Sequence, residues 1–302
     1  MTNQTGPQAP TREVLALDSA QRGEGPFVWR FNLYHRVTHA LVMVSFLLLA
    51  ATGLPLRFSQ ADWAGPMIAL FGGVERAGQL HRLGGIITFL YFGMHLAYVV
   101  VALVRSKNRM KLLWGPESMV PQPQDVKDFI GMFRWYLGKG PQPVFGRFSY
   151  MEKFDYFAVF WGVAIIGGSG LLLWFPEFFA GFLPGWAFNI ATVIHADEAL
   201  LATGFIFTVH FFNVHVRPGK FPLDEVMFTG RATTEYMEDE HGLIDGNLET
   251  LRDSAPSATP RVDHPAPPPG RRLSAVGAFL GFIALGVGLL LIGMILWAAL
   301  FY

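Results

Sequence analysis

Five long apolar runs constrain the fold of this chain more than any other feature of its sequence. Each is about as long as the 20 or so residues that an α-helix needs to cross a hydrocarbon core of about 30 Å. Hydrophobic residues make up 52% of the chain and charged residues 15%, a balance too apolar for an ordinary soluble domain. The sequence therefore predicts an all-α membrane protein, with transmembrane helices over 33–56, 83–104, 156–175, 195–216 and 273–301.

Composition excludes several classes of partner and cofactor. The formal net charge is +0 at pH 7, so no basic field favours a nucleic-acid partner. Cysteine is absent, which excludes disulfides, cysteine-ligated iron–sulfur clusters, thiolate-bound haem and covalently attached haem. The first 30 residues contain no apolar run typical of a signal peptide, and we expect the start of the chain to stay in the cytoplasm.

Lys and Arg residues predict the orientation of the helices. Residues 105–155 contain nine of them, whereas 175–194 contain none. Short cytoplasmic loops are enriched in Lys and Arg, so the first segment is expected in the cytoplasm and the second outside. Five spans then place the N-terminus inside and the C-terminus outside.

The spans divide the chain into four parts. These are a cytoplasmic tail (1–30), a four-helix core (31–228), a cytoplasmic linker with little packed core (229–272) and a fifth, C-terminal transmembrane helix (273–302). Within the core, the cytoplasmic loop 105–155 contains a pattern typical of an amphipathic helix on the membrane surface. The Gly277-x-x-x-Gly281 spacing predicts close packing of the fifth helix against another helix, in this chain or in a partner.

The transmembrane helices contain or adjoin seven of the nine histidines. Ionisable side chains at membrane depth are costly and usually mark a functional site, although a lone histidine can also simply hydrogen-bond to a neighbouring helix. The topology sorts the seven into two layers. Two lie towards the outer surface, His81 and His195, and five towards the inner surface, His35, His39, His95, His210 and His215.

Helical spacing aligns some of these histidines. His81 and His95 are 14 residues apart, a rise of about 21 Å with an angular offset of about 40°. His195 and His210 are 15 residues apart and about 60° out of phase. His215 is roughly 160° from His195 and is expected to point elsewhere.

Two layers of histidine match the needs of two six-coordinate b haems, because each haem takes two neutral imidazoles that face one another across a bundle. In the outer layer the pair is His81 with His195. In the inner layer we prefer His39 with His210, with His95 as the main rival. A third haem remains an alternative, because the inner layer holds a surplus of histidines.

Four motifs occur in an order and spacing found in a known family. They are R-V-T-H at Arg36–His39, Q-L-H-R-L-G-G-I around His81, G-R-F-S-Y-M-E-K-F-D-Y-F before the third span and I-H-A-D-E-A around His195. Over roughly residues 30–220 the chain resembles the cytochrome b subunits of membrane formate dehydrogenases, nickel–iron hydrogenases and thiosulfate reductases. The segment H-F-F-N-V-H-V-R-P-G-K-F-P, from His210 to Pro222, is similar to the branch associated with multihaem cytochromes c.

The resemblance implies a four-helix transmembrane haem-binding bundle with a quinone site beside the inner haem. It assigns the haem ligands to His39, His81, His195 and His210. It also implies electron transfer between a periplasmic redox partner and the quinone pool in a bacterial inner membrane. That partner is a multihaem cytochrome c, or iron–sulfur, molybdenum or hydrogenase subunits. The chain departs from the family pattern in its extra inner histidines, its long linker and its fifth span.

Several other polar residues are candidates for ligand contacts. Arg36 and Arg82 adjoin the two layers at opposite ends, where they can pair with haem propionates or serve as ordinary interfacial arginines. Four residues near the inner layer are candidates for the quinone site, His35, His215, Asp224 and Glu225. Solvated surface charge is the commoner explanation for the two carboxylates.

Two other classes of membrane protein are weaker alternatives. The spacings His35-x3-His39 and His210-x4-His215 superficially resemble the histidine boxes of di-iron desaturases and hydroxylases, but such a site needs more clustered histidines, and His81 lies on the far side of the membrane. An ion or proton transporter more often contains broken helices and mid-membrane carboxylates. Neither is evident in the sequence.

Overall fold

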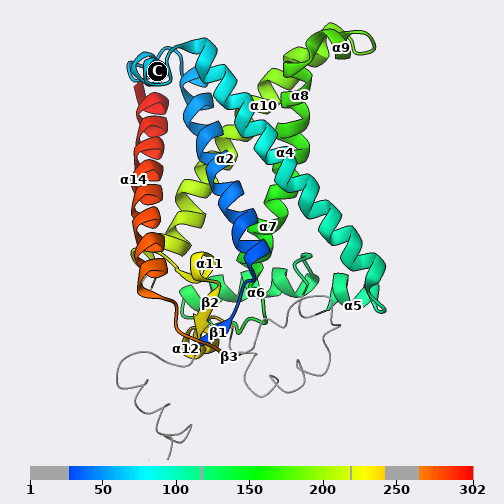
Figure 1. Cartoon of the computed structure of the whole chain (residues 1–302), viewed down its shortest axis with the longest axis vertical. Helices are drawn as coiled ribbons and strands as arrows, with labels where there is room; N and C mark the ends of the chain where they lie inside the picture. The colour runs from blue at the N-terminus through cyan, green and yellow to red at the C-terminus, as the bar shows by residue number, and fades with distance from the viewer. Residues whose placement is uncertain (1–26, 116–117, 218–219, 242–264, 302) are drawn as a thin grey trace, which may run out of the picture.

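The computed structural model describes residues 27–115, 118–217, 220–241 and 265–301. Five helices in that part of the chain are long and apolar enough to cross a membrane, as the apolar runs predicted. They stand side by side in Figure 1. Their bounds are α2 (Leu33–Arg57), α4 (Val74–Arg105), the continuous span of α7 (Tyr150–Gly162), η1 (Val163–Gly167) and α8 (Gly168–Trp174), the continuous span of α10 (Gly185–Phe205), η2 (Ile206–His210) and η3 (Phe212–Val216), and α14 (Arg271–Phe301).

The second, third and fourth spans begin six to ten residues earlier than their apolar runs. Among these three helices a side-chain cap is present only at the start of α7, because the N-cap residues of α4 and α10 are Gly73 and Pro184. At the start of α7, the side chains of Ser149 and Glu152 form a capping box, in which each accepts a hydrogen bond from the backbone N–H of the other. Because α4 begins at Val74 and α10 at Gly185, His81 and His195 lie well within their helices instead of at the first turn.

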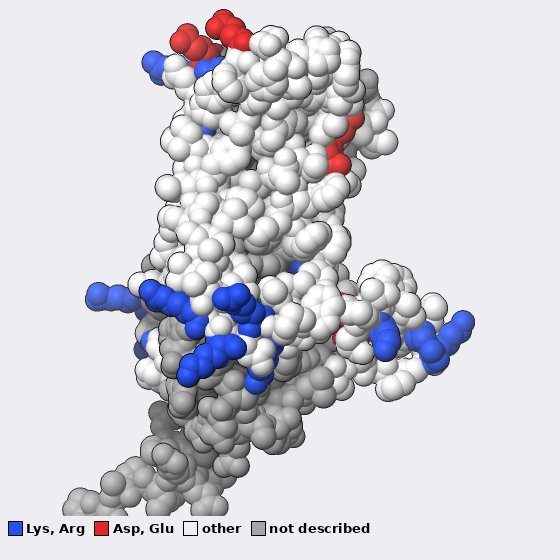
Figure 2. Space-filling model, turned by 90° about the vertical axis from the view of Figure 1, so that its right-hand side faces the viewer, with Lys and Arg blue, Asp and Glu red and all other residues white. Residues whose placement is uncertain are grey.

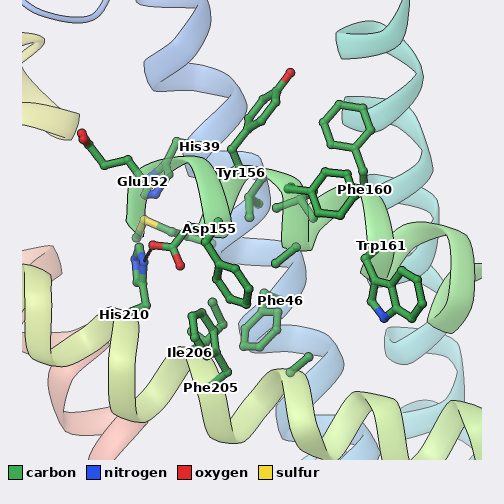
Figure 3. A pocket seen from close by; sticks show the side chains of 18 of the residues that line it. His39, Phe46, Glu152, Asp155, Tyr156, Phe160, Trp161, Phe205, Ile206 and His210 are labelled. Carbon is green, nitrogen blue, oxygen red and sulfur yellow. Dashed lines mark hydrogen bonds and ion pairs between the residues drawn. The ribbon is translucent and has the colours of Figure 1, made fainter. Parts of the chain in front are cut away.

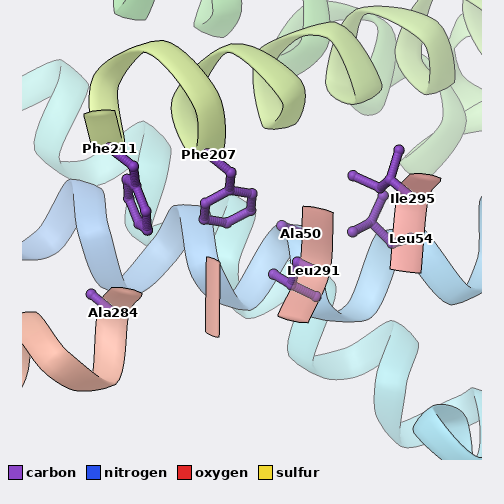
Figure 4. Packing of buried hydrophobic residues seen from close by; sticks show 7 residues of the cluster. All are labelled: Ala50, Leu54, Phe207, Phe211, Ala284, Leu291 and Ile295. Carbon is purple, nitrogen blue, oxygen red and sulfur yellow. The ribbon is translucent and has the colours of Figure 1, made fainter. Parts of the chain in front are cut away.

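The fifth span, α14, packs against the rest of this chain along a row of small residues. A Cβ atom at Gly281 would lie 2.8 Å from the side chain of Leu223, and one at Gly288 would lie 2.2 Å from the ring of Phe211. Only glycine permits so close an approach, so the packing partner of this face is the chain itself. An apolar cluster joins α14 to α2 and to the fourth span (Figure 4), and its buried members are Ala50, Leu54, Phe207, Phe211, Ala284, Leu291 and Ile295.

Within the other four spans, α2 packs along α4, and α10 packs along η1 and α8. Four short helices accompany them, α3 (Ala64–Leu70), α5 (Arg109–Trp114), α6 (Pro123–Tyr136) and α9 (Pro176–Ala180). The amphipathic helix expected in the loop 105–155 is α6. It lies across the lower end of the bundle in Figure 1, and its apolar side chains Phe129, Ile130 and Phe133 are 46%, 52% and 56% exposed, as a helix on a membrane surface requires.

A small antiparallel sheet closes the same end of the bundle. Strand β1 (Phe27–Trp29) lies between β2 (Arg231–Thr233) and β3 (Pro265–Ala266), with Phe27 opposite Thr233 in one pair and opposite Ala266 in the other. Two further short helices join it, α11 (Val226–Thr229) and α12 (Thr234–Glu240). We call this end the sheet end, and the opposite end the α9 end (Figure 1).

This sheet differs from the tail and linker expected at 1–30 and 229–272. The described parts of both segments fold together, because Val226, Ala232 and Met237 form a small buried core against Val28 and Phe31. Strands of three residues lack the apolar periodicity that makes a strand visible in a sequence. The remaining parts of the two segments, 1–26 and 242–264, lie outside the described residues.

Charge is distributed unequally between the two ends. Figure 2 shows Lys and Arg side chains gathered around the lower, sheet end of the visible face, with an almost uncharged zone above them. The uncharged zone coincides with the five spans. The basic belt coincides with the end that contains α5 and α6, where the nine Lys and Arg residues of 105–155 were counted.

Candidate cofactor-binding site

A single large cavity of about 2560 Å³ runs through the bundle. Sites for drug-sized ligands typically measure about 300–1,000 Å³, so this cavity has room for more than one large ligand. Its lining contains all seven histidines of the two predicted layers, His35, His39, His81, His95, His195, His210 and His215.

His81 on α4 and His195 on α10 face one another near the α9 end and are named here the α9-end pair. Their ring centres are 6.1 Å apart. A metal–imidazole bond is about 2.0–2.1 Å long, so two imidazoles on opposite sides of one iron atom have ring nitrogens about 4 Å apart and ring centres about 6 Å apart. The observed separation therefore fits an iron atom between the two rings.

Hydrogen bonds fix the tautomer of both rings in this pair. The Nδ1 atom of His195 lies 2.9 Å from the carbonyl oxygen of Ile166, which can only accept, so Nδ1 carries the proton. The hydroxyl of Thr52 donates to the carbonyl of Leu48 at 2.6 Å and therefore accepts from Nδ1 of His81 at 3.0 Å. Each Nε2 atom is left with a free lone pair, as in a metal-bound histidine whose other nitrogen is held by the protein.

Glycines and a widened helical turn make room for this pair. A Cβ atom at Gly53 would lie 3.2 Å from Cε1 of His81, and one at Gly170 would lie 3.0 Å from Cε1 of His195. Ile166, which accepts the His195 hydrogen bond, belongs to η1. Such π-helical turns occur frequently at functional sites, and here the turn presents a backbone carbonyl to a buried imidazole.

The second pair, His39 on α2 with His210 on η2, lies nearer the sheet end and is named here the sheet-end pair. The two imidazoles reach into the same space in Figure 3 and are close enough to influence one another electrostatically. The Nδ1 atom of His210 lies 2.9 Å from Oδ2 of Asp155 on α7. A carboxylate on Nδ1 again leaves Nε2 as the ligating atom and raises the basicity of the ring.

The π-helical turn η2 changes the phase of the fourth span. An ideal α-helix would leave His195 and His210 about 60° apart after 15 residues. Residues 206–210 form η2, and because a π-turn bonds residue i to i+5 it advances by fewer degrees per residue than an α-helix. The turn therefore reduces the overshoot and brings His210 back towards the face that carries His195.

His95, the rival ligand of the inner layer, is engaged at both ring nitrogens. Its Nδ1 lies 3.2 Å from the hydroxyl of Tyr34, and its Nε2 lies 2.8 Å from the hydroxyl of Tyr156. A histidine in this state has no free lone pair to offer a metal. In this arrangement His95 is less suited than His39 or His210 to bind a metal.

The two remaining inner histidines occupy different surroundings. His215 is 3% exposed, and its Nδ1 lies 2.9 Å from the carbonyl oxygen of Pro222. Its ring packs on Phe211 at 4.8 Å between centres. His35 lines the cavity, and its Nδ1 is buried and has no hydrogen-bond partner among the described residues.

The charged candidate residues differ in whether they line the cavity. Arg82 lines the cavity and lies over the ring of Trp174, whereas Arg36 lies outside the lining and donates from Nε to the carbonyl of Phe228 at 2.8 Å. Asp224 lines the cavity but pairs with Lys220 at 2.8 Å. Glu225 lies outside the lining.

A buried ionic cluster at the sheet end was missed at the level of sequence. Arg30 is 2% exposed and donates to Oε1 of Glu152 at 3.2 Å and to Nε2 of His241 at 3.3 Å. Nδ1 of His241 donates to the carbonyl of Gly146 at 2.8 Å, so Nε2 is an acceptor and the ring is neutral. Burial lowers the pKa of His241, and the neighbouring Arg30 charge lowers that pKa further.

Asp155 and Thr52 were also missed, although both support predicted ligands. Asp155 stands directly before the apolar run of the third span, and nothing in the sequence relates it to His210. Thr52 is a common residue in transmembrane helices, and nothing in the sequence relates it to His81. Only the packing of α2 on α4, and of α7 on α10, reveals these two contacts.

Comparison of the chain with protein-family models and with curated proteins found no match. The donor set itself is informative. No three His, Cys, Asp or Glu side chains of the described residues form a group that could hold a metal ion. Pairs of neutral histidines suit a metal that brings its other ligands with it, as haem iron does.

Proposed function

We propose that the chain is a membrane cytochrome b that holds one b haem between His81 and His195 and a second between His39 and His210. The observation that carries the proposal is the geometry of the α9-end pair. Its rings are 6.1 Å apart, both Nδ1 atoms donate to protein oxygens, and both residues line the cavity.

Bound haem would supply one-electron transfer, and the protein's own residues would set its position and environment. The four histidines would hold the two haems at two depths, since 15 residues of helix between His195 and His210 correspond to about 22 Å. Thr52 and the Ile166 carbonyl hold the first pair in one tautomer, and Asp155 holds the second. Arg82, which lines the cavity, is the better candidate for a propionate partner than Arg36.

The basic belt supports an orientation with the sheet end in the cytoplasm and the α9 end in the periplasm of a bacterial inner membrane. Electrons would then pass between a periplasmic redox subunit at the α9 end and a quinone near the sheet-end pair. Among the predicted quinone residues, the unpartnered Nδ1 of His35 favours that residue over Asp224 and Glu225. Membrane lipid surrounds the five spans, and the segment 210–222 favours a multihaem cytochrome c as the redox subunit.

One alternative gains support from the side chains. Asp155 provides a half-buried carboxylate within a span, and its buried Oδ1 atom has no partner among the described residues; ionisable side chains within spans are a feature of proton transporters. The di-iron alternative gains none, because the histidines separate into pairs at two depths.

The test is the haem content of the purified chain in detergent. We expect two non-covalent b-type haems per chain, a reduced-minus-oxidised spectrum with b-type bands, and reduction of both haems by duroquinol. Purified chain without haem would reject the proposal. Proton uptake by liposomes containing such haem-free protein would then identify the transporter instead.

A further inference from the structure

Tyr34, His95 and Tyr156 form a continuous hydrogen-bonded chain across three helices. The hydroxyl of Tyr34 on α2 meets Nδ1 of His95 on α4 at 3.2 Å, and Nε2 of the same ring meets the hydroxyl of Tyr156 on α7 at 2.8 Å. A neutral imidazole has one N–H donor and one acceptor nitrogen. Each His95 tautomer therefore accepts from one tyrosine and donates to the other.

This chain connects two depths of the protein. His39 and Tyr156 each lie six residues beyond the first residue of their helices at the sheet end, a rise of about 9 Å. Tyr34 lies one residue beyond the first, a rise of about 1.5 Å. The hydrogen-bonded chain thus leads from the depth of the sheet-end pair to the sheet end of the bundle. All three side chains line the central cavity.

The inner end of the chain borders a wall suited to a flat ring. Tyr156 packs on Phe160 at 5.1 Å between ring centres, and Phe160 packs on Phe92 at 5.2 Å. In Figure 3, Tyr156 lies between His39 and Phe160. An aromatic wall with one hydroxyl at its edge offers apolar contact to a ring and a hydrogen bond to a ring oxygen.

We propose that Tyr156, His95 and Tyr34 are a proton relay for a quinol or quinone bound beside Tyr156. This rests on the proposed function. Oxidation of a quinol breaks two O–H bonds and releases two protons and two electrons, and the two proposed haems would accept one electron each. The relay carries the two protons one after the other: each passes from the quinol to the Tyr156 oxygen, while Tyr156 protonates Nε2 of His95, Nδ1 protonates Tyr34, and Tyr34 releases a proton to water at the sheet end. His95 returns to its starting tautomer between the two transfers. Quinone reduction uses the same path in reverse.

The alternative role for His95 is structural, as a buried histidine that merely satisfies two hydroxyl groups. His95→Gln distinguishes the two roles, because an amide can still accept from one tyrosine and donate to the other but cannot pass a proton from one end to the other. The readout is the stopped-flow rate at which duroquinol reduces the haems of the purified protein. We expect two haems per chain in His95→Gln and a reduction rate about 10²-fold slower, the lower bound of typical acid–base contributions.

Two further variants control for folding and for the loss of any tyrosine. Tyr156→Phe removes one hydroxyl of the relay and is expected to slow the reaction as His95→Gln does. Tyr91→Phe removes a hydroxyl from a buried tyrosine four residues before His95 on the same helix and is expected to leave the rate unchanged. Haem content is measured for every variant.

The outcomes separate the relay from the function on which it rests. Two haems and a normal duroquinol rate in His95→Gln would overturn the relay alone. Loss of one haem in His95→Gln would also overturn it, because His95 would then be a ligand. A wild-type chain without haem would reject the proposed function together with the relay.

Discussion

The pair His81 and His195 is held by neutral hydrogen-bond partners, whereas the pair His39 and His210 is held by a carboxylate that contacts His210. In the α9-end pair, the Nδ1 atoms are held by a threonine hydroxyl and a backbone carbonyl. In the sheet-end pair, Asp155 holds His210, and the surplus histidines and tyrosines of the cavity gather around the same end. The two pairs consist of the same residue type, and the groups that hold Nδ1 of His81 and His195 differ from the group that holds Nδ1 of His210.

Under the proposed function, this difference would separate the site of electron transfer from the site of proton transfer. A neutral partner fixes a tautomer without adding a charge, which suits a site that exchanges only electrons. Titratable groups are costly at membrane depth, and the protein keeps most of those in the cavity at the end where a quinone would gain or lose protons. We therefore expect the α9-end pair to respond to packing, and the sheet-end pair to respond to charge.

The largest effect of packing on haem affinity is expected at Gly170. Gly170→Ala would place a Cβ atom 3.0 Å from the His195 ring, which is held in place by the Ile166 carbonyl. We expect about a 10- to 100-fold loss of affinity at the α9-end haem, the range for disturbed ligand orientation, and no change at the other haem. Haem titration of the apoprotein measures both sites.

Gly168→Ala is the matched control. Gly168 lies two residues before Gly170 in the same helix, α8, and nothing lies within 4 Å of its added Cβ atom. Equal losses in the two variants would mean that the α9-end site does not depend on the space beside His195.

A large charge effect is expected at Arg30. Arg30→Met would remove the buried cation beside Glu152, whose side chain is 36% exposed, so solvent screens part of the effect and we expect a loss below the about 3–5 kcal/mol of a fully buried pair. Thermal unfolding in detergent measures the loss. Arg57→Met is the comparison, because the Arg57–Asp197 pair is 46% and 57% exposed and exposed pairs contribute about 0–1 kcal/mol. Similar losses of stability in Arg30→Met and Arg57→Met would contradict the view that the Arg30 cluster stabilises the fold more than an exposed ion pair does.

Asp155 should tune only the sheet-end haem. Asp155→Asn keeps an oxygen acceptor for Nδ1 of His210 but removes the negative charge that stabilises the oxidised iron. We expect the midpoint potential of that haem to rise by roughly 60 mV, equivalent to a tenfold change for one electron, while the other haem is unchanged. Spectroelectrochemical titration resolves the two. A fall in potential, or an equal shift in both haems, would contradict the assignment.

The smallest effect is expected from the pH response of His241. Its pKa in the folded state is lowered by burial below the usual value of about 6.5, so the unfolded chain binds more protons. Stability is therefore fully present above about pH 6.5 and falls as the pH decreases towards the folded-state pKa, by at most about 1.4 kcal/mol per pH unit. His241→Gln should flatten this slope in unfolding measured from pH 7 to 5; an unchanged slope would assign it to other groups.

The sequence predicted the parts of this molecule that depend on one helix at a time. Apolar runs located the five spans, and helical depth selected the histidines that the structure brings into pairs. Features that depend on several helices were not predictable. The two ring nitrogens of His95 contact hydroxyl groups on two other helices. The direction in which His210 points depends on the π-helical turn η2. Strand β1 joins residues 27–29 to a segment about 200 residues later, with no periodicity to reveal it.

The most direct test of the account is the haem-to-chain ratio of three purified variants, measured beside the wild type. We expect two haems in the wild type, one in His81→Leu, one in His39→Leu and two in His95→Leu. The two single-haem variants should retain haems with different midpoint potentials, because each loses a different site. Two haems in either His81→Leu or His39→Leu, or one in His95→Leu, would contradict the pairing of His81 with His195 and of His39 with His210.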